Sequence, residues 1–228
     1  MLTSKRIKLI VFDWDDTFTT GATDAYVKCY HEALQQVGVT LGLEETKKRV
    51  INKWGRKVPE VFEELLKERL SLVREASEKY ESILLGDSFV DSLEIVDGAI
   101  GMLEQLSQNY TLCIATGVNP VLLEEKIMPK FNVPDVFSEI ISVYDLNNPI
   151  HTKPHPYMLQ IIMKNQNVSL AETMYVGDAV GDLQMAKNAG VLFVAVLTGQ
   201  MSSEEANNLG ADHVIDDVSL LANVLVNP

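Results

Sequence analysis

Two acidic motifs in this chain place carboxylates directly after short apolar runs. Asp13 and Asp15 follow one such run near the N-terminus, and Asp178 and Asp182 follow another. If the two runs are neighbouring strands, these carboxylates converge, and like charges that close together do not all stay ionised without a cation. Hard oxygen ligands suit Mg²⁺, which usually binds through one or two carboxylates together with a substrate phosphate. The spacing therefore predicts a Mg²⁺ site that accepts a phosphorylated ligand.

Two further apolar runs end in groups that bind anions. Thr116 and Gly117 close the run 111–115 and offer a hydroxyl and exposed backbone N–H groups. Lys153 follows the run 140–144 after a short loop, and its ammonium is a point charge suited to phosphate. These groups complement the acidic motifs if all four runs end at the same place.

The elements that would position these groups alternate along the chain. Short apolar runs rich in branched residues predict buried strands, at 7–12, 111–115, 140–144, 174–176, 192–197 and, more weakly, 213–215. Helix-length segments lie between them, at 98–107, 121–130, 154–165, 179–189 and 202–209. Strands that are apolar throughout and alternate with helices predict an α/β fold with a doubly wound parallel sheet. Ligands bind such sheets at the carboxyl ends of the strands.

Residues 21–95 do not follow this alternation and contain almost no strand signal. Their apolar residues recur at helical spacing instead, over 25–37, 43–54 and 58–80. We interpret 21–95 as an all-helical cap domain inserted after the first strand. The α/β core domain would then comprise residues 1–20 and 96–228.

Composition limits the classes of partner. The 228 residues include 19 Lys and Arg against 32 Asp and Glu, a net charge of −13, which repels nucleic acid and anionic membrane surfaces. No apolar run approaches the ~20 residues of a membrane-spanning helix, and we expect no signal peptide. The two cysteines, Cys29 and Cys113, make neither a disulfide framework nor a structural zinc site. We expect a cytoplasmic protein, a monomer or a homodimer.

Four motifs occur in a fixed order, and together they resemble the haloacid dehalogenase-like (HAD) superfamily. They are Asp13-x-Asp15-x-Thr17, Thr116, Lys153 followed by Pro-His-Pro, and Gly177-Asp178-x-x-x-Asp182. Each stands at a predicted strand end, and the resemblance covers essentially the whole chain. The inserted helical segment resembles the cap of the phosphoglycolate phosphatase-like and β-phosphoglucomutase-like branch.

The resemblance implies a role for each acidic residue. Asp13 would be the nucleophile that forms an aspartyl-phosphate. Asp15 would protonate the leaving alcohol and then deprotonate the attacking water. The Asp13 carboxylate, the Asp15 backbone carbonyl and Asp178 would hold Mg²⁺, and Asp182 would support that set through water or hydrogen bonds.

The resemblance also implies where phosphate and substrate bind. Thr116, the Gly117 N–H and Lys153 would neutralise charge on the transferring phosphoryl group. Arg56 lies where the helical pattern breaks at Trp54-Gly55, the position of a cap loop in relatives. It is a candidate substrate contact, although a solvated helix face explains its basic surroundings equally well. One departure from the pattern is Asp16, a position that is usually glycine.

The function that follows is Mg²⁺-dependent hydrolysis of a small phosphorylated metabolite. A phosphomutase shares the aspartyl-phosphate step and is the first alternative. A catalytically silent binding protein is a weaker one, because both Asp13 and Asp15 are present. A hydrolytic dehalogenase needs neither Asp15 nor the second acidic motif, so we rank it lowest.

Overall fold

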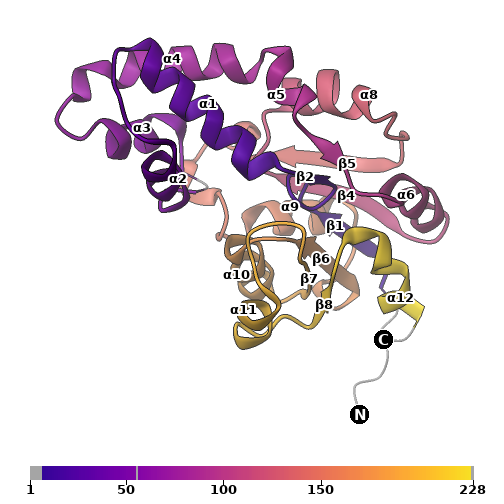
Figure 1. Ribbon diagram of the computed structural model, residues 1–228. Helices are drawn as coiled ribbons and strands as arrows, with labels where there is room; N and C mark the ends of the chain where they lie inside the picture. The colour runs from indigo at the N-terminus through magenta and orange to yellow at the C-terminus, as the bar shows by residue number, and fades with distance from the viewer. Residues whose placement is uncertain (1–6, 55, 227–228) are drawn as a thin grey trace. The chain divides into compact units, whose positions relative to one another are not determined.

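The computed structural model describes residues 7–54 and 56–226, which divide into two compact units. An α/β unit contains the chain up to Thr20 and from Glu94 onward, and a helical unit contains Gly21–Leu93. Figure 1 shows the elements of each unit. The chain rejoins the α/β unit at Glu94 because β3 (Glu94–Ile95) pairs antiparallel with β2 (Thr19–Thr20).

The α/β unit is built on a six-stranded sheet with the order β5-β4-β1-β6-β7-β8. All five strand pairs are parallel. The strands are β1 (Leu9–Phe12), β4 (Thr111–Thr116), β5 (Phe137–Ser142), β6 (Thr173–Gly177), β7 (Leu192–Val196) and β8 (His213–Ile215). From β1 the chain adds strands on one side, then returns to add strands on the other, which is the doubly wound order. The predicted fold class is confirmed.

Helices cover both faces of this sheet. They are α6 (Ala99–Ser107), α7 (Pro120–Leu122), α8 (Met128–Lys130), α9 (Tyr157–Asn165), α10 (Val180–Ala189), α11 (Ser203–Asn208) and α12 (Leu221–Val226). Alternate strand residues such as Leu9, Val11 and Tyr175 share one buried cluster with α9, α10 and α11. Helices α6 and α12 pack against each other, and α6 packs against β4. Because β1 is apolar on both faces, all four of its residues are buried.

Two segments of the α/β unit differ from the sequence-based expectation. Strand β5 covers 137–142 rather than 140–144, because the chain turns at Ser142. The Ser142 side chain accepts from the Tyr144 N–H, and the Asp145 carboxylate accepts from the Ser142 N–H, which starts a 3₁₀ turn. The predicted helix 121–130 is interrupted by a π-helical turn over Leu123–Ile127 between α7 and α8.

The helical unit contains α1 (Ala22–Gln36), α2 (Leu43–Ile51), α3 (Val58–Leu66), α4 (Val73–Leu84) and α5 (Asp87–Asp91). Helix α1 packs against α2 and α4, and the rings of Tyr30, Phe62 and Tyr80 meet in the core. The pattern 58–80, expected as one helical stretch, splits into α3 and α4. Lys67 ends α3 with a positive φ of 42°, which no helix continues through.

Both cysteines are core residues. Cys29 is buried in α1 and Cys113 in β4. Burial raises the pKa of Cys29 to about 11 and that of Cys113 to about 12, so both thiols stay protonated at neutral pH. Within the described ranges, no helix is both long and apolar enough to cross a membrane.

Candidate active site

The turn that follows β1 carries the first acidic motif. The Asp13 N–H donates to the Val176 carbonyl of β6 at 2.9 Å, so Asp13 extends the strand by one step. Its side chain is buried. The chain then reverses at Asp16, whose φ of 53° lies in the left-handed region. Aspartate adopts that region more readily than most residues, so the turn forms without glycine. Asp15 lies in the same turn and is half-buried.

The end of β6 carries the second acidic motif, and Gly177 explains its spacing. A Cβ atom at Gly177 would lie 2.7 Å from Cγ of Asp182, so the motif leaves room only for glycine. Asp182 stands in the first turn of α10, and its Oδ2 accepts from the Ala179 N–H at 3.1 Å. This folds the Asp182 side chain back over the strand end, beside Asp178.

The two strand ends meet, as the sequence predicts. Asp13, Asp178 and Asp182 each offer a carboxylate oxygen, and these atoms lie within 4.8 Å of one another. All three residues are buried. Lys153 Nζ lies between two of them, 2.8 Å from Asp13 Oδ2 and 2.7 Å from Asp182 Oδ1. The structure therefore gathers three carboxylates and one ammonium in a small buried volume.

The cluster contains three carboxylates and one ammonium, and burial together with these charges shifts the pKa values of its members. Burial raises the pKa of Asp13 to about 6; Lys153 opposes that rise and Asp182 adds to it. Burial, reinforced by Asp182 and Asp13, holds the pKa of Asp178 well above its usual value. Burial disfavours the Lys153 ammonium, but the Asp13 and Asp182 carboxylates outweigh it and raise its pKa. The site holds excess negative charge that a cation would relieve.

The donor set fits a divalent metal ion. Asp13 Oδ1 is buried and has no hydrogen-bond partner among the described residues, so it is an oxygen that a cation could use. Carboxylate oxygens are the ligands that Mg²⁺ prefers. The geometric cluster contains Asp182 in addition to Asp13 and Asp178. A contribution from the Asp15 backbone carbonyl stays a prediction.

Thr116 and Gly117 lie at the same edge of the sheet. Strand β4 is the neighbour of β1, with Ile114 beside Phe12, so Thr116 ends β4 close to the level of Asp13. The Thr116 side chain is buried, and its Oγ1 accepts from the Val118 N–H at 3.3 Å. Gly117 is exposed and has open space around its Cα.

Tyr175 contacts the site, and the sequence reasoning missed it. Its buried hydroxyl lies 2.8 Å from Asp182 Oδ1 and 3.1 Å from the Ala115 carbonyl oxygen. The Lys153 ammonium lies 5.8 Å from the centre of its ring. Burial and the nearby Asp182 raise the pKa of Tyr175, so it stays a donor. Its place two residues before Gly177 was the available signal, because side chains alternate along a strand.

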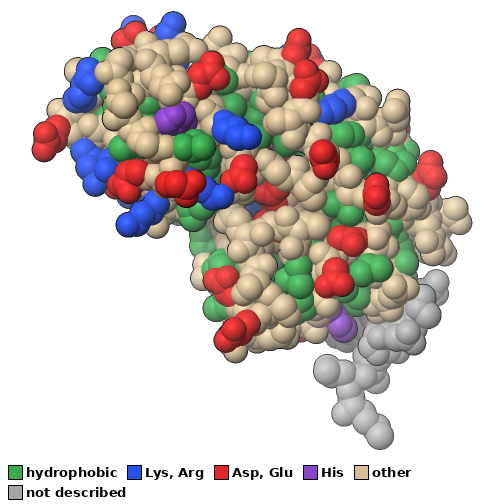
Figure 2. Space-filling model, in the orientation of Figure 1, with side chains coloured by type: hydrophobic (Ala, Val, Ile, Leu, Met, Phe, Trp, Pro, Cys, Tyr) green, Lys and Arg blue, Asp and Glu red, His purple; other side chains and the backbone are tan. Residues whose placement is uncertain are grey.

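Arg56 belongs to the helical unit, in the connection between α2 and α3. It is exposed, and Gly55 beside it lies outside the described residues. On the face in Figure 2, Lys and Arg side chains gather over the helical unit. In the helical unit, Lys47 contacts Asp24 and Arg49 contacts Glu45. The substrate contact of Arg56 stays a prediction.

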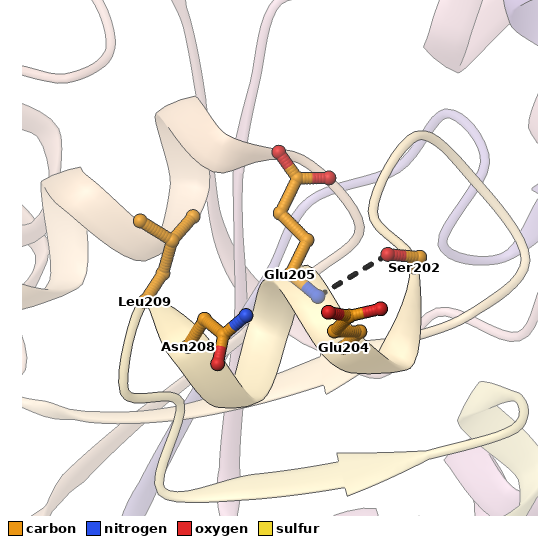
Figure 3. A pocket seen from close by; sticks show the side chains of 5 residues that line it. All are labelled: Ser202, Glu204, Glu205, Asn208 and Leu209. Carbon is orange, nitrogen blue, oxygen red and sulfur yellow. Dashed lines mark hydrogen bonds between the residues drawn. The ribbon is translucent and has the colours of Figure 1, made fainter.

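A shallow depression lies elsewhere on the α/β unit, along α11. Figure 3 shows its lining, which consists of Ser202, Glu204, Glu205, Asn208 and Leu209. The Ser202 hydroxyl caps the helix by accepting from the Glu205 N–H. Two carboxylates and no cation make this lining unsuited to a phosphorylated ligand, unlike the cluster around Asp13.

Comparisons with known proteins indicate the family of this chain. A family model described as haloacid dehalogenase-like hydrolase matches residues 7–190. A phosphoglycolate phosphatase of Vibrio parahaemolyticus is 24% identical over 232 residues, covering 98% of each chain. A glyceraldehyde 3-phosphate phosphatase of Pyrococcus abyssi is 31% identical over 195 residues, 81% of this chain and 79% of that protein.

Solved structures share the fold. The crystal structure of a predicted phosphoglycolate phosphatase from Haemophilus somnus superposes with a TM-score of 0.79 at 18% identity, covering 97% of this chain and 99% of that one. The matched motifs, the doubly wound sheet and the paired strand ends lead to one assignment. This chain belongs to the haloacid dehalogenase-like hydrolase family.

Proposed function

We propose that this protein is a Mg²⁺-dependent phosphatase that hydrolyses monoesters of small phosphorylated metabolites through an aspartyl-phosphate. The observation that carries the proposal is the buried cluster at the ends of β1 and β6. It sets Asp13, with one oxygen that lacks a hydrogen-bond partner among the described residues, beside Asp178 and the Lys153 ammonium. The phosphatase names of the relatives support the same reaction.

The two steps are assigned to Asp13 and Asp15. A carboxylate oxygen of Asp13 bonds to phosphorus while the bond from phosphorus to the alcohol oxygen breaks, and Asp15 gives that oxygen a proton. Asp15 then takes a proton from water as the water oxygen attacks phosphorus, which frees Asp13 and releases phosphate. Asp13 must be ionised to attack, and its pKa of about 6 allows this at neutral pH.

The remaining groups bind and neutralise the phosphoryl group. The Thr116 hydroxyl, the Gly117 N–H and Lys153 would bind its oxygens. A bound Mg²⁺, held by Asp13, Asp178 and the Asp15 carbonyl, would supply positive charge against phosphate and carboxylates. Both oxygens of Asp182 accept hydrogen bonds, from Lys153 and Tyr175 on one side and from Ala179 on the other. This supports a role for Asp182 in holding the site.

The first experiment measures phosphate release from an aryl phosphate with Mg²⁺, with EDTA, and with Asp13→Asn. We expect activity that requires Mg²⁺ and disappears in the variant. Asp24→Asn is the matched control, since Asp24 is an exposed carboxylate paired with Lys47 in the helical unit. Activity that persists in Asp13→Asn would overturn the proposal.

A second experiment tests the intermediate. Acid-quenched protein from a reaction with ³²P-labelled substrate should carry label on Asp13, and Asp15→Asn should retain it for longer because water activation is slowed. Product analysis separates the alternatives: a phosphatase releases inorganic phosphate, whereas a phosphomutase returns the phosphoryl group to a sugar. A silent binding protein would show neither.

Phosphoglycolate and glyceraldehyde 3-phosphate belong in the first substrate panel, because the relatives are named for them. If Arg56 contacts substrate, Arg56→Ala should raise KM with little change in kcat. Arg74→Ala is the control, because Arg74 is exposed in the same unit and pairs only with Glu78 among the ion pairs of the described residues. The oligomeric state and the cytoplasmic location stay predictions.

A further inference from the structure

The loop after β7 reaches back to both acidic motifs. Thr198 Oγ1 donates to the Asp16 carbonyl oxygen at 2.6 Å. The Gln200 N–H donates to Asp178 Oδ2 at 3.0 Å, and the Met201 N–H donates to the Asp178 carbonyl oxygen at 2.9 Å. One short segment, residues 198–201, therefore contacts the turn after β1 and the end of β6. We refer to it as the β7 loop.

Gly199, at the centre of the β7 loop, lies directly against the Asp178 carboxylate. A Cβ atom at Gly199 would lie 1.9 Å from Oδ2 of Asp178 and 2.4 Å from its Cγ. Such a contact is far inside van der Waals distance, so any side chain at this position displaces the carboxylate. Gly199 is not among the glycines with positive φ, so space rather than backbone conformation requires it.

The contacts determine where the Asp178 carboxylate lies. One of its oxygens is held by a backbone N–H, and its Cβ and Cγ are confined by Gly199. The same side chain is buried and belongs to the carboxylate cluster with Asp13 and Asp182. Residues that orient a metal ligand typically change metal affinity about 10- to 100-fold when substituted.

We propose that the β7 loop is a positioning element that holds the Asp178 carboxylate, and the backbone of the Asp16 turn, in the arrangement that binds a divalent cation. Gly199 acts through its lack of a side chain, and Thr198 acts through its hydroxyl. The inference rests on the proposed function, because it assumes that the carboxylate cluster binds metal.

The test is Mn²⁺ binding to metal-free, full-length protein, followed by electron paramagnetic resonance, with thermal unfolding in EDTA alongside. Gly199→Ala should weaken Mn²⁺ binding about 10- to 100-fold. Gly101→Ala is the matched control, since Gly101 lies in α6 with open space around it, and it should leave Mn²⁺ affinity unchanged.

A second pair of variants keeps the test decisive if Gly199→Ala folds poorly. Thr198→Val should weaken Mn²⁺ binding about 2- to 10-fold, the equivalent of one hydrogen bond. Thr173→Val is its control, because the Thr173 hydroxyl also donates to a backbone carbonyl, that of Ser169, at the opposite end of β6. Both Thr→Val variants should lose similar thermal stability, and only Thr198→Val should lose affinity.

The possible results separate the two proposals. Wild-type protein that binds Mn²⁺, with Gly199→Ala and Thr198→Val binding equally well, overturns the role of the β7 loop and leaves the proposed function standing. Equal loss of affinity in Thr198→Val and Thr173→Val also overturns it, because the effect would then be general destabilisation. Wild-type protein that does not bind Mn²⁺ overturns the metal dependence of the proposed function and the loop inference with it.

Discussion

Replacing Lys153 by Met removes the ammonium that contacts two carboxylates of the buried cluster. Lys153 is largely buried, with 15% of its side chain exposed, and contacts Asp13 at 2.8 Å and Asp182 at 2.7 Å. Methionine keeps an unbranched apolar stem of similar length and loses the charge. In metal-free protein the two carboxylates would then be buried without their cation.

The expected loss of stability is large. Removing one partner of a buried ion pair costs about 3–5 kcal/mol, because the remaining charge is left uncompensated. Lys153 also lowers the pKa of Asp13, so its loss shifts that carboxyl further toward the protonated form. Protonation removes part of the penalty, so the loss should be greatest near pH 8 and smaller near pH 5.

Urea denaturation in EDTA measures this loss, with Lys8→Met as the matched control. Lys8 forms a contact of 2.5 Å with Glu172, but 60% of its side chain is exposed, and exposed pairs contribute about 1 kcal/mol or less. We expect Lys153→Met to lose at least twice as much stability as Lys8→Met. Equal losses in the two variants at pH 8 would refute the reasoning from burial.

Burial, hydrogen bonding and the shifted pKa values lead to three further predictions. Because the pKa of Asp13 is raised from 3.8 to about 6, the ionisation of this one carboxyl should lower the stability of metal-free protein by about 3 kcal/mol as pH rises through that range. In urea denaturation, Asp13→Asn should remove this contribution, and a pH profile equal to that of wild type would contradict it. Tyr175→Phe should cost about 1.5–3 kcal/mol, because the hydroxyl donates to the Asp182 carboxylate, and a midpoint equal to wild type would argue against that bond. Iodoacetamide near pH 8 should label Cys29 and Cys113 only after denaturation, because both thiols are buried and have raised pKa values. Mass spectrometry measures the labelling, and labelled cysteines in native protein would disprove the prediction.

The sequence by itself identified the six strands of the large sheet and the four motifs. Apolar runs such as 7–12 and 174–176 predict strands that are buried on both faces. Such a run is recognised from its own residues, without knowledge of the neighbouring strands. The polar residues that follow them stand at strand ends, and parallel strands all end at one edge. The convergence of Asp13 with Asp178 could therefore be predicted only on the condition that their strands are neighbours, and the pairing of β1 with β6 meets that condition.

The boundaries of helices and strands and the local turns were harder to predict from the sequence. Strand β5 ends at Ser142 because a side chain and a backbone N–H satisfy each other there, and α3 ends at Lys67 in a backbone conformation that lysine rarely adopts. In both cases a local bond or a single dihedral angle overrides the apolar pattern that continues through the segment.

Only the tertiary structure decided how the carboxylates are held. Lys153 bridges Asp13 and Asp182, two residues that are far apart in the chain. It can do so because Lys153 follows β5, which ends at the same edge of the sheet as β1 and β6. The β7 loop holds Asp178 through backbone N–H groups and an absent side chain at Gly199. Every residue except proline carries such an N–H, so the N–H contacts of Gln200 and Met201 do not depend on residue type. The need for glycine at position 199 follows from how close Asp178 lies in space, which the sequence does not state.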